Sequence, residues 1–271
     1  MPELPEVETT VRGIRPHLLK QEIENLVVRE NRLRWPVTPG LESILQQQTV
    51  ERIWRRGKYI LIEVNSGVFL IHLGMSGSLR IVKREDKIEK HDHFDLVTTG
   101  GGIARFRDPR RFGCLLWAGE KPLDHPLICG LGVEPLSDEF NGEYLSNFAK
   151  ARSSPIKNII MNARIVVGVG NIYASESLFR AGIHPLRSGR RISAKRLSTL
   201  VSSIKHVLKR AIDKGGTTLQ DFVGADGQAG YFDQKLNVYG RSGQHCYGCD
   251  SVIRNVVIAQ RSTFYCPSCQ R

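Results

Sequence analysis

Pro2, Glu3 and Glu6 place an unusual nucleophile beside two carboxylates near the start of the chain. If Met1 is removed, Pro2 ends in a secondary amine, whose pKa ordinarily lies at about 7.7 to 8, so part of it is neutral at physiological pH. Attack on an aldehyde-like carbon would form an iminium ion, which keeps its charge because a secondary amine has no second proton to lose. That charge would favour proton abstraction from the adjacent carbon. These residues therefore predict elimination chemistry, with an ordinary solvated N-terminus as the alternative.

A helix is expected to position this terminus. Apolar residues recur at spacings of four, three and four, which places them on one face of a helix. These residues are Val7, Val11, Ile14 and Leu18. Pro5 suits the first helical turn, where its missing N–H costs no hydrogen bond. We therefore expect the reactive group on the free end of a helix that is anchored by its apolar face.

Short stretches rich in Val, Ile, Leu and aromatic residues follow this helix and predict strands. They are residues 22–28, 50–56, 58–64, 68–73, 78–83, 94–98, 103–107 and 114–118. Glycine-containing turns, among them Gly100-Gly101-Gly102, separate them. Many short strands at close spacing indicate an antiparallel sandwich or barrel over about the first 120 residues.

The pattern then changes to helices. Residues 153–161 and 172–180 are predicted helices, and a glycine-containing turn that ends in Asn171 joins them. Such a turn offers free N–H groups at a positive helix end, where a phosphate can bind, although a plain capped helix explains it as well. A longer amphipathic helix is predicted to begin after Ser193 and to end at Gly215-Gly216.

Two Cys-x-x-Cys pairs lie near the end of the sequence, with sixteen residues between them. They are Cys246 with Cys249 and Cys266 with Cys269. In a reducing compartment this spacing predicts one tetrahedral Zn²⁺ site. Four thiolates leave no open coordination position, so the metal should be structural. The apolar residues between the pairs predict a hairpin with Arg261 at its tip.

Charge and hydropathy limit the partners of the chain. It has 39 Lys and Arg against 27 Asp and Glu, a formal charge of +12 that favours a polyanion as the partner, usually nucleic acid.

Neither a signal peptide nor an apolar run of about 20 residues is recognised, so we expect a cytoplasmic protein that does not enter membranes. Cys114 and Cys129 lie among apolar residues and are predicted to be buried thiols.

Five motifs make the sequence resemble the bacterial formamidopyrimidine-DNA glycosylases from its first residue to its last. They are Pro2-Glu3-Leu4-Pro5-Glu6, His72-Leu73-Gly74-Met75-Ser76-Gly77, Asp108-Pro109-Arg110-Arg111-Phe112-Gly113, Val169-Gly170-Asn171-Ile172-Tyr173 and the four-cysteine hairpin. The resemblance implies an α+β fold in three parts: an antiparallel β-sandwich with a flanking helix in residues 1–132, a helix–two-turn–helix domain with a lesion-recognition loop in 133–234, and a zinc-binding β-hairpin in 235–271. It also implies a monomer associated with the bacterial nucleoid.

The resemblance further implies a bifunctional DNA glycosylase and AP lyase of base excision repair. Such an enzyme removes oxidised purines, 8-oxoguanine and formamidopyrimidines, from duplex DNA through a Schiff base on its N-terminal proline, and then cleaves the strand by β,δ-elimination. Pro2 matches this nucleophile, Glu3 matches the carboxylate that acts as acid and base, and Glu6 lines the same pocket. Lys58 matches a lysine assigned to β-elimination, and Arg261 matches a fingertip arginine assigned to δ-elimination. Taken alone, Lys58 would be a solvated lysine at a strand end.

DNA-contacting positions of the family are assigned in the same way. Met75, Arg110 and Phe112 match the triad that fills the gap left by an extruded nucleotide, although their spacing alone would put Met75 and Phe112 in a core. Asn171 matches a phosphate-binding residue, and His91 matches a DNA-contacting histidine. Weaker candidates for phosphate contacts are Arg152, Lys157, Tyr239 and Arg241. The lesion-recognition loop corresponds to about residues 217–231.

Two other functions fit parts of the pattern. The first is endonuclease VIII, a sibling enzyme that repairs oxidised pyrimidines and typically has glycine where this chain has Leu4. The second is a zinc-ribbon DNA-binding or regulatory protein without chemistry, for which the basic charge, the cysteine hairpin and the capped helix would suffice. A protein that only binds DNA has no need of the amine of Pro2, so this residue separates the two classes.

Overall fold

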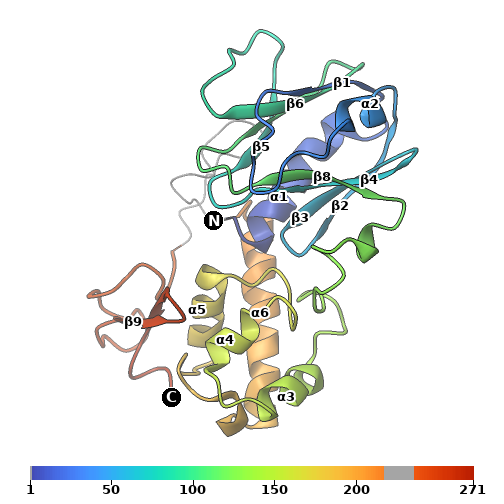
Figure 1. Ribbon diagram of the computed structural model, residues 1–271. Coiled ribbons are helices and arrows are strands. Elements are labelled where there is room, and N and C mark those ends of the chain that lie inside the picture. Colours follow the sequence, from blue (N-terminus) through green and yellow to red (C-terminus); the bar gives the residue numbers. More distant parts are fainter. Residues whose placement is uncertain (1, 217–234) are drawn as a thin grey trace. The chain divides into compact units, whose positions relative to one another are not determined.

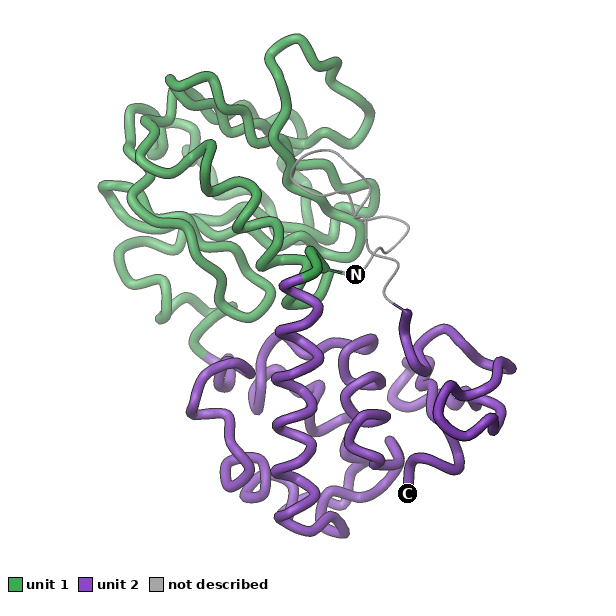
Figure 2. Tube along the Cα trace, turned by 180° about the vertical axis from the view of Figure 1, so that it is seen from behind, with its two compact units in different colours: residues 1–129, 214–233 green, residues 130–213, 234–271 purple. Residues whose placement is uncertain are grey.

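The structure is a computed structural model that describes residues 2–216 and 235–271 (Figure 1). The chain forms two compact units, one from residues 1–129 and 214–233 and the other from residues 130–213 and 234–271 (Figure 2). The C-terminal hairpin therefore belongs to the same unit as the helices. The finer division of the chain at residues 132 and 234 stays a prediction.

Helix α1, Leu4–Leu18, confirms the predicted helix at the start of the chain. The four residues of its predicted apolar face are each 1% exposed or less. The helix contacts β5 (Ser78–Val82) of one sheet and β2 (Val50–Arg56) and β3 (Tyr59–Val64) of the other. A guanidinium N–H of Arg15 also donates to the carbonyl of Ile53 at 2.7 Å, which ties the helix to a strand. The apolar face thus anchors the N-terminal end of the chain on the sandwich.

Two antiparallel four-stranded sheets make up the sandwich, with strand orders β1-β6-β7-β5 and β2-β3-β4-β8. The strands are β1 Ile23–Val28, β2 Val50–Arg56, β3 Tyr59–Val64, β4 Gly67–His72, β5 Ser78–Val82, β6 Asp92–Thr98, β7 Ile103–Arg107 and β8 Cys114–Gly119. Side chains from both sheets share one core, in which Phe94 and Phe106 stack with ring centroids 4.9 Å apart. The predicted strands are confirmed, and with them the α+β class.

Two loops cross from one sheet to the other side by side. Residues 73–77 lead from β4 to β5, and residues 108–113 lead from β7 back to β8. His72 pairs with Cys114 at one end of the loops, and Ser78 pairs with Arg107 at the other. Because the flanking strands pair at both ends, the loops must run alongside each other.

The second unit contains the helices α3 Gly142–Lys150, α4 Ile156–Ile160, α5 Asn171–Arg180 and α6 Ala194–Asp213. Helix α6 confirms the long amphipathic helix, and α4 is shorter than the helix predicted there. Helix α3 was not predicted; the side chain of Asn141 caps it by accepting from the backbone N–H of Tyr144 at 2.9 Å. Three short elements were also not predicted: α2 Leu41–Leu45, η1 Pro122–Asp124 and η2 Gly189–Arg191.

Strands β9 Arg254–Ile258 and β10 Arg261–Tyr265 confirm the predicted hairpin. Arg261 pairs with Ile258, so the turn consists of Ala259 and Gln260, which have φ values of +47° and +59°. Arg261 is the first residue after this turn and is exposed.

The prediction of two buried thiols is correct for one and wrong for the other. Cys114 is buried and Cys129 is exposed. The N–H of Cys129 donates to the carbonyl of His125 at 2.9 Å, which makes this segment a tight turn. Neighbouring residues of such a turn point in different directions, and Ile128 takes the buried position. None of the helices among the described residues has both the length and the apolar character of a membrane span.

Candidate functional site

Pro2 and both neighbouring carboxylates are buried at the beginning of α1. Glu3 is 3% exposed and Glu6 is 0% exposed. The backbone N–H of Glu3 donates to Glu6 Oε2 at 2.8 Å, and the Glu3 side chain accepts from the backbone N–H of Glu6. This reciprocal capping satisfies two N–H groups that a helix start leaves without intrahelical partners. The structure therefore holds Pro2 in a defined place, with both carboxylates at the positive end of the helix dipole.

Gly216 packs against the same carboxylate in the first unit. Its φ is +87°, and a Cβ added there would lie 3.3 Å from Glu6 Cγ. The chain that follows the long helix therefore returns to the Pro2 region before residue 217. The predicted lesion-recognition loop, residues 217–231, lies outside the described residues, as does Met1.

Lys58 lies in the tight turn between β2 and β3. The turn starts with Gly57, whose φ of +58° suits glycine. Arg55 braces the turn, because its NH1 donates to the carbonyl of Gly57 at 2.9 Å while its Nε pairs with Glu8 of α1 at 3.3 Å. The arginine thus connects the turn that carries Lys58 with the helix that carries Pro2.

His72 is a half-buried residue whose ring is influenced by the charge of Lys58. Burial first, and then the positive charges of Lys58 and Arg34, lower the pKa of His72 to about 4. Its Nδ1 accepts from the N–H of Gly74 at 3.0 Å, and its ring lies 4.8 Å from that of Tyr59. His72 belongs to the motif His72-Leu73-Gly74-Met75-Ser76-Gly77, which predicts no separate role for it. It joins the Lys58 turn to the loop of residues 73–77.

Met75 and Phe112 are exposed, so the alternative that places them in a core is wrong. They are 39% and 38% exposed and lie on the two side-by-side loops, 73–77 and 108–113. The guanidinium of Arg110 lies over the ring of Phe112 at 5.0 Å. The structure thus gathers two large apolar side chains and a cation on one edge of the sandwich.

His91 adjoins the second of these loops. Its backbone has a φ of +78°, and its carbonyl accepts from the N–H of Asp108 at 3.1 Å. Its ring lies 6.2 Å from that of His93 in an edge-on arrangement. The structure therefore brings His91 close to the backbone that leads to Arg110.

Asn171, Lys157 and the hairpin meet in the second unit. Lys157 is only 1% exposed, and its ammonium donates to Asn171 Oδ1 at 2.5 Å and to Thr263 Oγ1 at 2.7 Å. Asn171 Nδ2 in turn donates to the carbonyl of Ser262 at 2.9 Å. Arg261 directly precedes this contact. The ammonium of Lys157 is thus bound by protein groups, which gives it a different environment from the phosphate contact that the sequence suggested.

Glu176 is a functional candidate that the sequence analysis missed. It is 4% exposed, and its two oxygens accept from the backbone N–H groups of Asn237, Val238 and Tyr239 at 2.9 to 3.0 Å. The ring of Tyr239 lies edge-on to Phe264, 5.1 Å away. Glu176 therefore positions Tyr239 on the hairpin side of the unit. In the sequence, Glu176 is recognisable only as an acidic residue within the helix that begins at Asn171.

Arg152 and Arg241 are occupied by protein carbonyls. Arg152 NH1 donates to the carbonyl of Phe148 at 2.8 Å at the end of α3. Arg241 is 9% exposed, its NH1 donates to the carbonyl of Asn237, and its guanidinium lies 3.5 Å from the ring centroid of Tyr247. These contacts stabilise the local structure.

Cys246, Cys249, Cys266 and Cys269 form the predicted cluster, with all four sulfur atoms within 4.8 Å of one another. Neighbouring Sγ atoms are 3.3 to 3.9 Å apart. A tetrahedral Zn²⁺ with bonds of about 2.3 Å to sulfur would set these distances at about 3.8 Å. Hydrogen bonds from Ser251 lower the pKa of Cys249 to about 6, whereas burial raises the pKa of Cys266 and the hydrogen bond with Cys249 raises the pKa of Cys269. The cysteines therefore fit one structural Zn²⁺.

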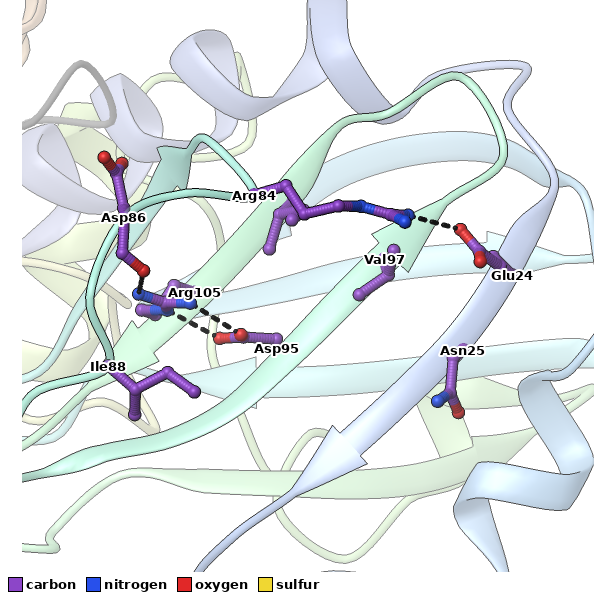
Figure 3. A pocket seen from close by; sticks show the side chains of 9 residues that line it. Glu24, Asn25, Arg84, Asp86, Ile88, Asp95, Val97 and Arg105 are labelled. Atoms are coloured by element: carbon purple, nitrogen blue, oxygen red, sulfur yellow. Dashed lines mark hydrogen bonds and ion pairs between the residues drawn. The ribbon is translucent and has the colours of Figure 1, made fainter.

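A cavity of about 340 Å³ lies elsewhere in the first unit, against β1, β6 and β7 (Figure 3). Its charged side chains bond to one another: Arg105 to Asp95 at 2.9 Å, and Arg84 to Glu24 at 3.1 Å. None of the predicted site residues lines it. This cavity is therefore separate from the candidate site residues Pro2, Lys58, Met75 and Phe112.

Two family models match the chain. The formamidopyrimidine-DNA glycosylase N-terminal domain matches residues 1–115, and the formamidopyrimidine-DNA glycosylase H2TH domain matches residues 131–223. The chain is 54% identical to the formamidopyrimidine-DNA glycosylase of Alcanivorax borkumensis and 52% identical to that of Methylococcus capsulatus, and each alignment covers 100% of both proteins.

Solved structures are similar over the same length. The crystal structure of the MutM (Fpg) protein from Thermus thermophilus is 35% identical, with a TM-score of 0.89 over 99% of this chain and 98% of that one. A complex between Lactococcus lactis Fpg and DNA that contains an abasic site is 30% identical, with a TM-score of 0.91 over 100% of both chains.

Proposed function

The chain belongs to the formamidopyrimidine-DNA glycosylase family, and from this membership we propose that the Pro2 amine carries out its chemistry after Met1 is removed. As a member of this family it is a DNA glycosylase and AP lyase that removes oxidised purines in base excision repair. Its site of action is chromosomal DNA in the bacterial cytoplasm. The buried capping pair of Glu3 and Glu6, which holds Pro2, is the observation that carries the assignment of the nucleophile.

The reaction starts with the neutral nitrogen of Pro2. This atom attacks C1′ of the damaged nucleotide, and the bond from C1′ to the base breaks, so that the base leaves with the electron pair and takes up a proton. Opening of the sugar ring leaves an iminium ion between Pro2 and C1′. Glu3 supplies a proton to the ring oxygen and removes one in the later steps, because it adjoins the nucleophile and is shielded from water.

Strand cleavage follows from the charge of the iminium. Loss of a proton from C2′ expels the 3′ phosphate, and loss of a proton from C4′ in a second elimination expels the 5′ phosphate. Lys58 assists the first elimination and Arg261 the second, each by placing a positive charge beside a leaving phosphate. Glu6 holds the terminus through its bond to the Glu3 N–H.

DNA is held by groups of both units. Met75 and Phe112 fill the space left by the extruded nucleotide while Arg110 bonds the orphaned base; their exposure supports this role. His91 contacts the DNA, and Asn171 binds a phosphate through its backbone N–H at the start of α5, because its side-chain amide is bound to Lys157 and Ser262. The four cysteines hold one Zn²⁺, whose chemistry is structural: it fixes the hairpin that carries Arg261.

Strand cleavage by a Pro2→Gly variant tests this proposal. Duplexes with 8-oxoguanine or with thymine glycol are incubated with processed wild type and with the variant. We expect the wild type to cleave the oxidised purine duplex in preference to the pyrimidine duplex. The variant should lose cleavage, because a glycine terminus is a primary amine whose imine can shed its charge. Cleavage at the wild-type rate by Pro2→Gly would overturn the proposal.

A further inference from the structure

The two loops that carry Met75, Arg110 and Phe112 touch through their backbones. Gly74 has a φ of +67°, and a Cβ added there would lie 2.4 Å from the carbonyl carbon of Phe112. A Cβ on Gly113 would lie 2.7 Å from the carbonyl oxygen of His72. Only glycine permits so close an approach, so loops 73–77 and 108–113 form one packed layer.

Asp108 connects these two loops through its buried carboxylate. It is 0% exposed, and its Oδ1 accepts from the hydroxyl of Ser76 at 2.7 Å while its Oδ2 accepts from the N–H of Gly113 at 2.8 Å. The N–H of Arg110 lies 3.3 Å from both Asp108 Oδ1 and Ser76 Oγ. One carboxylate thus bonds to the first loop and to both ends of the segment that carries Arg110 and Phe112.

The backbone of Asp108 is itself fixed to the sheet. His93, 4% exposed on β6, lies with its Nε2 2.7 Å from the Asp108 carbonyl oxygen. The Asp108 N–H donates to the carbonyl of His91, and the Arg111 N–H donates to the Asp108 carbonyl at 3.1 Å. The carboxylate therefore acts from a rigid position on the sandwich.

We propose that Asp108 is a positioning residue, which locks both loops into one wedge so that Met75 and Phe112 enter the duplex together. The inference rests on the proposed function of these two side chains as fillers of the gap in the DNA. Large apolar side chains on separate mobile loops would lose conformational freedom when they insert. The Asp108 contacts remove that freedom before DNA binds, which lowers the cost of extruding the damaged nucleotide.

Ser76→Ala and Asp108→Asn test the proposal with two substrates. Ser76→Ala removes the hydroxyl that bonds across the loops. Asp108→Asn replaces one acceptor oxygen with an NH2 group, which cannot accept the hydrogen bond that this oxygen accepts. The first substrate is a duplex with 8-oxoguanine, where a nucleotide must be extruded. The second is a single-stranded oligonucleotide with a preformed abasic site, which offers no duplex to open. Ser76→Thr, which keeps the hydroxyl, and Ser66→Ala, in the turn between β3 and β4, are the matched controls.

We expect single-turnover excision from the duplex to fall about tenfold in both test variants, as the loss of one bond to a buried charged group implies. Cleavage of the single-stranded abasic substrate should stay within about twofold of wild type, and both controls should match wild type on both substrates. Unchanged duplex excision, or an equal fall on both substrates, would overturn the positioning role. If Asp108→Asn fails to fold, Ser76→Ala alone decides. Failure of the wild type on both substrates would instead refute the proposed function.

Discussion

Replacing Lys157 with methionine distinguishes two roles that this residue could have: a structural clamp between the helices and the hairpin, or a direct contact with DNA. The side chain is 1% exposed, and its ammonium donates to Asn171 Oδ1, Thr263 Oγ1 and the carbonyl of Ser262. Methionine has a similar length and fills the same space without charge. Two of the three partners lie on β10, so the change removes a connection between the helices and the hairpin.

The expected loss of stability follows from these contacts. A hydrogen bond to a charged group contributes about 1.5–3 kcal/mol, and burial of the ammonium itself costs several kcal/mol. The bonds at 2.5 and 2.7 Å are the stronger ones, and their loss leaves Asn171 Oδ1 without that donor. We therefore expect Lys157→Met to lower the unfolding free energy by about 2–4 kcal/mol.

Denaturant unfolding of the zinc-loaded protein measures this loss, and the salt dependence of DNA affinity gives the second readout. A lost phosphate contact reduces the slope of log affinity against log salt by about 0.9, whereas a lost clamp lowers affinity at all salt concentrations with an unchanged slope. Lys195→Met, at an exposed lysine of α6, is the control for the charge alone. An unchanged unfolding free energy together with a reduced salt slope would show that Lys157 contacts a phosphate and is not a structural clamp.

Three further changes have expected outcomes. Gly74→Ala should lower the unfolding free energy by about 2 kcal/mol or more, because φ is +67° and the new Cβ would meet the Phe112 backbone; an unchanged melting temperature would contradict this. Since burial lowers the pKa of His72 to about 4, the unfolded chain binds more protons between about pH 6.5 and 4, and stability should fall by up to about 3 kcal/mol as the pH drops through this range. His72→Gln should flatten this dependence, and an identical pH profile would refute the assignment. Cys266→Ser should abolish zinc binding, loosen the hairpin and weaken DNA binding; full affinity in a zinc-free variant would contradict the structural role of the metal.

Periodicity predicted the regular elements because their signals are local. The apolar face of α1 and the ranges of the sandwich strands could be read from residues a few positions apart. The short helices α2 and α3 were missed, since five and nine residues contain too few turns to establish a helical period. Cys129 was wrongly predicted as buried because apolar neighbours in an irregular turn do not show which side chain faces the core.

The site residues were named by motifs, but their partners come from distant parts of the sequence. Ser76 bonds to Asp108 and Glu176 bonds to Tyr239, pairs separated by 32 and 63 positions. Lys157 reaches Thr263 across 106 positions. Residue spacing within one helix or strand does not predict such contacts. A lysine that is buried as a structural clamp therefore cannot be distinguished in the sequence from a surface lysine that binds a phosphate.

Borohydride trapping during turnover tests the central role of Pro2 most directly. The processed protein is mixed with duplex DNA that contains 8-oxoguanine, the iminium is reduced, and the adduct is mapped by peptide mass spectrometry. We predict one covalent adduct, on the nitrogen of Pro2. An adduct on a lysine, or strand cleavage by protein that retains Met1, would show that a different atom is the nucleophile.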